Sequence, residues 1–105
     1  MELARAVVDV MVDLQSENVL LLDMQQVTIL ADYFVIGTAT SQRQARAVLD
    51  AIAERGKRAL GVRPLHVEGE PESGWVLIDF GSVVVHLFTE EMRRYYDLEG
   101  FWRNA

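Results

Sequence analysis

The feature that most constrains the fold is a pair of short apolar runs, residues 74–80 and 83–88, separated by only Gly81 and Ser82. A two-residue connection that begins with glycine is typical of a type II′ turn, which joins two antiparallel strands into a β-hairpin. Side chains along such strands alternate between two faces. One face of this hairpin is wholly apolar and should lie in the core; it holds Val76, Ile78, Phe80, Val83, Val85 and Leu87.

The other face of the hairpin is apolar but carries a carboxylate and an imidazole. Helices could cover this face, or part of it could be exposed, since aromatic and leucine side chains bordered by charge are typical of protein interfaces. Both alternatives stay open at this point, and Trp75 is the member that we least expect to be wholly inside. The face pairs Trp75 with Phe88, Leu77 with His86, and Asp79 with Val84.

Two further apolar runs, residues 19–24 and 33–38, are too short for helices, and we expect both to be central strands. A helix of about 20 residues should follow, with Ser41 as its N-cap and Gly61 after its end. The next strand is expected at about residues 63–68. Strand, helix and strand in this order predict a βαβ unit with parallel strands and a right-handed crossover.

The two ends of the chain predict two more helices. Near the start, apolar residues from Leu3 to Leu14 recur with the spacing of an amphipathic helix. Near the end, Thr89 is placed to cap a short last helix, while residues 68–74 read as an exposed loop. We therefore expect an α/β fold in which a mixed sheet of about five strands, made of one βαβ unit plus a C-terminal β-hairpin, packs with three helices.

The chain has 105 residues, half of them apolar, and no cysteine. This length and composition indicate a single domain, residues 1–105, that buries about 60 to 70 per cent of its unfolded surface. No apolar run is long enough to span a bilayer, and acids interrupt what would have to be the apolar stretch of an N-terminal signal. We therefore expect a cytoplasmic protein that does not bind membranes.

Charge is distributed unevenly along the chain, whose net charge is −6. Residues 1–42 hold six acids and one base, residues 43–63 hold six bases and two acids, and residues 64–105 hold eight acids and three bases. Each phosphate contact with a nucleic acid needs a Lys or Arg, so the acidic balance argues against a protein that depends on such contacts. A basic protein is the better candidate for a partner.

Catalytic chemistry finds little support in the sequence. The strands offer only isolated Asp23 and Asp79, whereas nucleotidyl transfer needs two or three carboxylates together to hold Mg²⁺. His86 has no accompanying nucleophile motif and is expected to be a structural or interface histidine. One alternative stays open: residues 37–41 form a strand-to-helix turn of the kind that binds phosphate in α/β proteins, although Ala39 stands where glycine would be wanted.

Four motifs occur in a definite order: DYFVIGTATS at residues 32–41, EG at 68–69, GWVLIDFGSVVVHLF at 74–88 and YYDLEGFW at 95–102. In order and spacing they resemble the motifs of the ribosomal silencing factor family, also called RsfS or Iojap. The resemblance covers nearly the whole chain, and the four motifs together make it specific. It implies a fold like that of nucleotidyltransferases but without their catalytic carboxylates.

The same resemblance implies a protein that is not an enzyme and that needs no cofactor or metal. Such a protein would bind the large ribosomal subunit through the basic ribosomal protein L-fourteen, block joining of the small subunit, and repress translation when nutrients are short. Contact with ribosomal RNA would be peripheral at most. A homodimer of the free protein stays open. The alternative function is that of a nucleotide-binding or nucleotidyltransferase-like protein that uses residues 37–41. The contact residues implied by the motifs are Trp75, Leu77 and Asp79, followed by Asp32, Tyr33, Tyr96, Asp97, Leu98 and Glu99.

Overall fold

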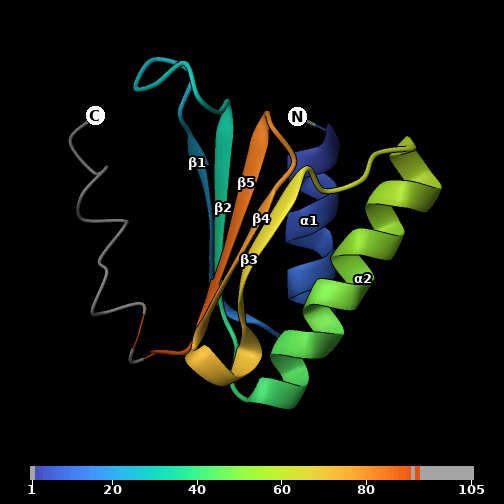
Figure 1. Ribbon diagram of the computed structural model, residues 1–105, viewed down its shortest axis with the longest axis vertical. Helices are drawn as coiled ribbons and strands as arrows, with labels where there is room; N and C mark the ends of the chain where they lie inside the picture. Colours follow the sequence, from blue (N-terminus) through green and yellow to red (C-terminus); the bar gives the residue numbers. More distant parts are fainter. Residues whose placement is uncertain (1, 91, 93–105) are drawn as a thin grey trace.

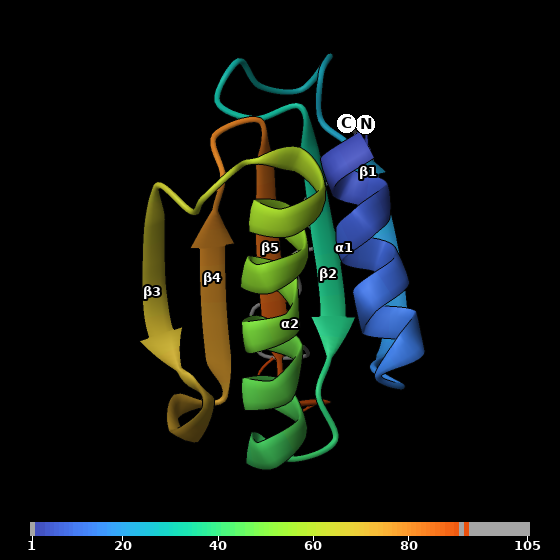
Figure 2. The ribbon, with the colours of Figure 1, turned by 90° about the vertical axis from the view of Figure 1, so that its right-hand side faces the viewer.

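A computed structural model of the protein describes residues 2–90 and 92, which form one mixed β-sheet with two α-helices on one of its faces (Figures 1 and 2). The elements in chain order are α1 (Glu2–Asp13), β1 (Glu17–Asp23), β2 (Tyr33–Thr38), α2 (Gln42–Leu60), β3 (His66–Glu70), the 3₁₀ turn η1 (Pro71–Ser73), β4 (Trp75–Asp79) and β5 (Val83–Phe88). The five strands lie in the order β1-β2-β5-β4-β3, and only β2 and β5 are parallel neighbours. The expected α/β fold with a mixed sheet of five strands is confirmed.

The C-terminal hairpin has the predicted register. Trp75 pairs with Phe88 at the far end of the hairpin, and Asp79 pairs with Val84 next to the turn. The Phe80 N–H donates to the Val83 carbonyl at 2.9 Å, and Gly81 has a φ of 93°, as the first central residue of a type II′ turn requires. The face that was expected in the core is there: Val76, Ile78, Val83, Val85 and Leu87 are buried, and Phe80 packs against them.

The strands β2 and β3 that flank α2 run in the same direction, because β2 is parallel to β5 and two antiparallel steps lead from β5 to β3. The crossover is right-handed, as predicted (Figure 2). The strands are not neighbours, however, since the hairpin β4–β5 lies between them. β3 also begins later than expected and runs to Glu70, so three of the seven residues predicted to be a loop belong to the sheet edge.

The core lies between the sheet and the two helices. Capping residues at its two ends determine where α2 begins and ends. The Ser41 Oγ accepts from the Gln44 N–H at 3.0 Å, and Gly61 ends the helix at a φ of 65°. Neither of the two described helices is long and apolar enough to cross a membrane. The buried helix residues are Ala4, Val7, Val10 and Met11 of α1 and Ala45, Val48, Ile52 and Gly56 of α2.

The described residues differ from two predictions about the architecture. The described residues hold two α-helices and not three; the Thr89 Oγ1 does accept from the Met92 N–H at 3.3 Å, as in a cap, but most of the predicted last helix lies outside the described residues. β1 is an edge strand and not a central one. Its run of leucines suggested burial on both faces, yet Leu20 is 36% exposed, and the strand carries an irregularity between Glu17 and Leu20.

Candidate interaction surface

The three first-rank residues of the candidate surface, Trp75, Leu77 and Asp79, lie on one face of β4. They alternate with the buried Val76 and Ile78, so their side chains point away from α1 and α2. All three are half-buried. Because both described helices lie on the other face of the sheet, these helices do not cover the three side chains (Figures 1 and 2).

Aromatic rings extend this surface across three strands. The Trp75 and Phe88 rings stack with their centroids 6.4 Å apart, and Phe88 is nearly parallel to the His86 ring at 6.0 Å. The Phe34 ring of β2 lies at a tilted angle 4.9 Å from His86. Phe34 could not be assigned to this face from the sequence, because only the parallel pairing of β2 with β5 places it there.

Among the described residues of this face, His86 is the one strongly buried titratable side chain, with 6% of its surface exposed. Neither ring nitrogen has a hydrogen-bond partner in the described part of the chain. Burial lowers the pKa of the imidazole from 6.5 to about 4, because the charged ring would lose its hydration. At neutral pH the side chain is therefore an uncharged ring that packs among its neighbours, consistent with a structural histidine.

Acidic side chains follow the edge strand beside β4. Glu68 lies opposite Leu77 in the register, and Glu68 and Glu70 are both exposed along β3. Gly69 between them has a φ of 82°, and a Cβ there would lie 2.2 Å from the Trp75 carbonyl oxygen. Only glycine can therefore hold the edge strand this close to β4. The apolar strip of β4 is bordered by negative charge on this side.

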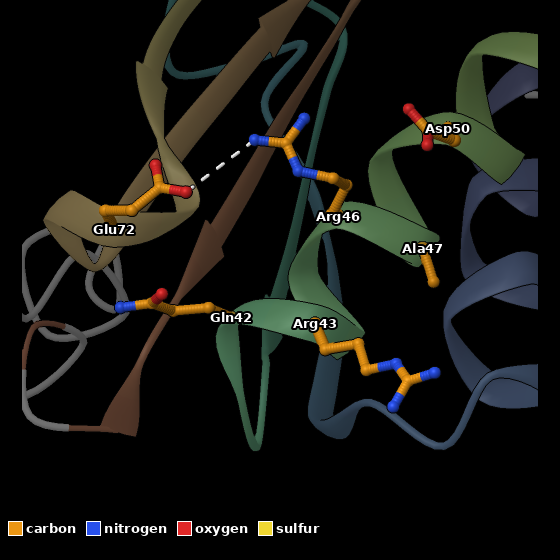
Figure 3. A pocket seen from close by; sticks show the side chains of 6 residues that line it. All are labelled: Gln42, Arg43, Arg46, Ala47, Asp50 and Glu72. Atoms are coloured by element: carbon orange, nitrogen blue, oxygen red, sulfur yellow. Dashed lines mark ion pairs between the residues drawn. The ribbon is translucent and has the colours of Figure 1, made fainter.

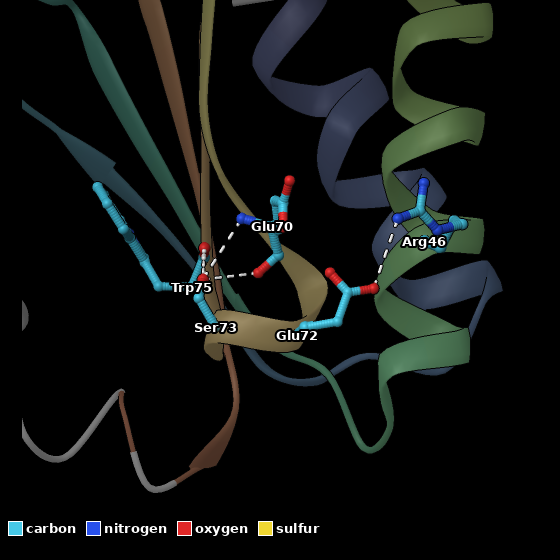
Figure 4. Close-up of polar contacts among 5 residues, drawn as sticks. All are labelled: Arg46, Glu70, Glu72, Ser73 and Trp75. Atoms are coloured by element: carbon cyan, nitrogen blue, oxygen red, sulfur yellow. Dashed lines mark hydrogen bonds and ion pairs between the residues drawn. The ribbon is translucent and has the colours of Figure 1, made fainter.

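Trp75 is positioned by the turn that precedes it (Figure 4). The Ser73 Oγ lies 2.7 Å from the Glu70 carbonyl oxygen and 3.1 Å from that of Trp75, and it accepts from the Glu70 N–H at 3.3 Å. Glu72 in the same turn lies 3.7 Å from the Arg46 guanidinium of α2. These contacts attach the start of β4 to the edge strand and to the helix.

Asp79 has a structural role besides any contact that it makes. One of its carboxylate oxygens, Oδ1, accepts from the Gly81 N–H at 2.7 Å and so supports the hairpin turn. The imidazole of His66, opposite Asp79 in the register, lies 2.8 Å from the Glu68 carboxylate. Substituting Asp79 would therefore disturb the turn as well as remove a charge.

The structure separates some of the second-rank residues. Tyr33 pairs with Val83 and packs against the helix-side core, so it does not share a face with Trp75. Asp32 is exposed, and its N–H donates to the Ser82 carbonyl at 2.7 Å, which places it beside the hairpin turn. Tyr96, Asp97, Leu98 and Glu99 lie outside the described residues.

The turn at residues 37–41, the candidate phosphate site, uses its backbone donors internally. The Ala39 N–H donates to the Phe88 carbonyl at 2.8 Å, and the Thr40 N–H donates to the Gln44 side chain at 2.7 Å. A Cβ on Gly37 would lie 2.7 Å from the Met11 sulfur, so this glycine serves helix packing. The cavity beside the turn measures about 10 Å³, which is room for about one water. These features argue against a nucleotide site.

A larger recess of about 420 Å³ lies between α2 and η1 (Figure 3). This recess could not be predicted from the sequence, because α2 and η1 are far apart along the chain. Its charges balance, with two arginines against two carboxylates, and one ion pair spans it. It offers no excess charge to attract an ionic ligand. The lining residues are Gln42, Arg43, Arg46, Ala47, Asp50 and Glu72.

Comparison with known proteins identifies relatives over most of the chain. The chain is 39% identical to the ribosomal silencing factor RsfS of Bacillus subtilis over 93 residues, which is 89% of this chain and 78% of that protein. A crystal structure of a protein from Chromobacterium violaceum superposes with a TM-score of 0.89 at 32% identity, covering 96% of this chain and 83% of the other. A mouse protein named for mitochondrial assembly of the large ribosomal subunit is 39% identical over 74 residues, 68% of this chain and 32% of its own length.

The family model described as "Ribosomal silencing factor during starvation" matches residues 1–105, the whole of the chain. The four motifs that suggested this family lie within that match, and the fold agrees with that of a 32% identical relative. The chain therefore belongs to the ribosomal silencing factor family.

Proposed function

We propose that this protein represses translation by binding the large ribosomal subunit and preventing the small subunit from joining it. Family membership supports a ribosome-associated silencing role. The name of the mouse relative, which refers to assembly of the large subunit, favours that subunit as the binding site. The proposed contact on it is the basic ribosomal protein L-fourteen, and the site of action is the cytoplasm.

The observation that carries this proposal is the half-buried strip of Trp75 and Leu77 on β4, which lies on the face away from both described helices. Exposed Glu68 and Glu70 border it on the edge strand. An apolar centre with a charged rim is the usual composition of a protein interface. The acidic rim is complementary to a basic protein and would repel the phosphates of RNA.

The mechanism needs occupancy and no chemical step. A bound domain that fills space needed by the small subunit prevents joining for as long as it stays bound. A dissociation constant between micromolar and nanomolar, about −8 to −12 kcal/mol, would be sufficient for a factor present at concentrations comparable to those of ribosomes. Inhibition should therefore be stoichiometric with large subunits.

A binding experiment on isolated large subunits tests the surface. We expect Trp75→Ala to weaken binding by about 2 kcal/mol or more, because a large aromatic anchor loses its contact area. Urea unfolding of the free variant must show that it still folds. If Trp75→Ala folds and binds large subunits as tightly as the wild type does, the β4 strip is not the interface.

A matched pair of charge reversals separates the acidic rim from general electrostatics. Glu68→Lys lies on the proposed surface, whereas Asp50→Lys makes the same charge change on the exposed side of α2. We expect Glu68→Lys to slow association and to reduce its dependence on salt, and Asp50→Lys to do so much less. Equal effects of the two variants would mean that net charge matters and the location does not.

A further inference from the structure

Two large apolar side chains are displayed without cover at one end of the sheet. Ile29 is 101% exposed and Leu30 is 83% exposed, on the loop of residues 24–32 that joins β1 to β2 at the top of Figure 1. Burying either side chain against a partner would favour association, and contiguous apolar side chains on a protein surface mark sites where partners bind. Neither residue belongs to the β4 strip described above.

The backbone of this loop is held by hydrogen bonds, so the exposure of the pair is a property of the fold. The Met24 N–H donates to the Asp32 carbonyl at 2.7 Å and closes the base of the loop. The Leu30 N–H donates to the Thr28 Oγ1 at 3.1 Å. Met24 and Ala31 are buried and anchor both ends of the loop. Ile29 and Leu30 are therefore presented outward on a fixed support.

The charge around the loop identifies the chemistry of a partner. No Lys or Arg occurs between residues 6 and 42, and the exposed carboxylates of Asp23 and Asp32 stand at the two ends of the loop. Such a surface repels the phosphates of a nucleic acid and attracts a basic protein. The Asp32 and Tyr33 N–H groups donate to the Ser82 carbonyl, which joins the loop to the hairpin turn beside Asp79. The loop is thus continuous with the proposed docking surface.

We propose that Ile29 and Leu30 are a second anchor, inserted into an apolar depression on a basic protein of the large ribosomal subunit while Asp23 and Asp32 face its Lys and Arg side chains. This inference rests on the proposed function and assigns to it a contact outside β4. The loop and the β4 strip would engage the partner together. Two anchors on separate parts of the sheet also fix the orientation of the bound domain, which a blocking mechanism requires.

The test compares the binding of purified large subunits to the wild type, to I29S/L30S and to Val12→Ser, a control that removes a 58% exposed apolar side chain from α1. We expect I29S/L30S to bind about 30-fold more weakly, which is about 2 kcal/mol, at every salt concentration. Val12→Ser should bind as the wild type does. The urea midpoints of both variants should be unchanged, because the side chains that are removed make no core contacts.

The outcomes separate this inference from the function beneath it. If the wild type binds large subunits and I29S/L30S binds them equally well, the second anchor is refuted and the proposed function stands. If the wild type does not bind at all, both fail. If I29S/L30S changes only the self-association of the free protein in sedimentation equilibrium, the loop contacts a second copy of this chain, and the proposed partner is wrong.

A direct readout of burial follows from the absence of cysteine in the chain. Ile29→Cys introduces a unique thiol that can carry an environment-sensitive fluorophore, and Val12→Cys provides the matched control on α1. Adding large subunits should shift the emission of the probe at position 29 to the blue and leave the probe at position 12 unchanged. An unshifted probe at position 29, under conditions in which the labelled protein co-sediments with large subunits, would overturn the proposal.

Discussion

Lowering the pH should destabilise this protein through His86. Around the ring stand Leu77, Ile36, Phe34 and Phe88, which offer no charged group to stabilise an imidazolium. Burial lowers the pKa from 6.5 to about 4, so the fold favours the neutral ring. Between about pH 6.5 and about pH 4, the His86 ring binds a proton in the unfolded chain but not in the folded chain. The contribution of the neutral ring to the free energy of unfolding is therefore fully present above about pH 6.5, and it is lost as the pH falls toward 4. The full effect is about 3 kcal/mol, at about 1.4 kcal/mol per pKa unit.

The assay is urea unfolding followed by tryptophan fluorescence at several values between about pH 7.5 and about pH 4.5. His86→Leu removes the titrating ring and forfeits no hydrogen bond to any residue that the structure describes, so at pH 7 we expect the variant to be about as stable as the wild type. The carboxyl groups titrate in both proteins, and therefore only the difference between the two curves reports on His86.

That difference should reach about 2.5 kcal/mol near pH 4.5, with the wild type losing the more stability. If His86→Leu and the wild type lose stability in parallel over the whole range, the ring is hydrated in the folded protein, and our description of this face as desolvated is wrong.

Three further outcomes follow from the backbone and the turns. Gly69→Ala should lower the free energy of unfolding in urea more than Gly61→Ala does. Both positions have a positive φ, which costs an alanine about 1–2 kcal/mol, but only at Gly69 would the new Cβ also collide with the backbone. Similar losses of stability in the two variants would show that β3 can move away from β4 at little cost. Ser41→Ala should lower the free energy of unfolding by about 1 kcal/mol through loss of the N-cap, measured the same way. Calorimetry with ATP or GTP and Mg²⁺ should detect no binding, and saturable heat that Thr40→Pro abolishes would restore the nucleotide alternative.

Local patterns predicted the parts of the fold that depend on neighbouring residues. The Gly81-Ser82 turn determines the hairpin register, because pairing spreads outward from the turn one residue at a time. Ser41 and Gly61 likewise bound α2 through contacts within a few residues. Predictions of this kind were confirmed because each rests on a single short-range interaction.

Non-local pairing accounts for the errors. An apolar run such as residues 19–24 is compatible with an edge or a central strand, because the strands that pair with it depend on how the rest of the chain folds. The insertion of the hairpin between β2 and β3 could not be read from either strand. The same limit hid Phe34 from the candidate surface and hid the fact that Tyr33 lies on the opposite face of the sheet. Ile29 and Leu30 were missed for another reason, because apolar residues in a sequence predict burial and carry no sign of exposure.

Whether a bound copy of the protein blocks subunit joining can be measured by titrating the protein into large subunits and following their association with small subunits by light scattering. We expect joining to fall in proportion to the protein added and to be abolished at about one copy per large subunit when the concentrations exceed the dissociation constant. Trp75→Ala should shift the titration to higher concentration. Normal joining of large subunits that demonstrably carry the protein would refute the blocking mechanism.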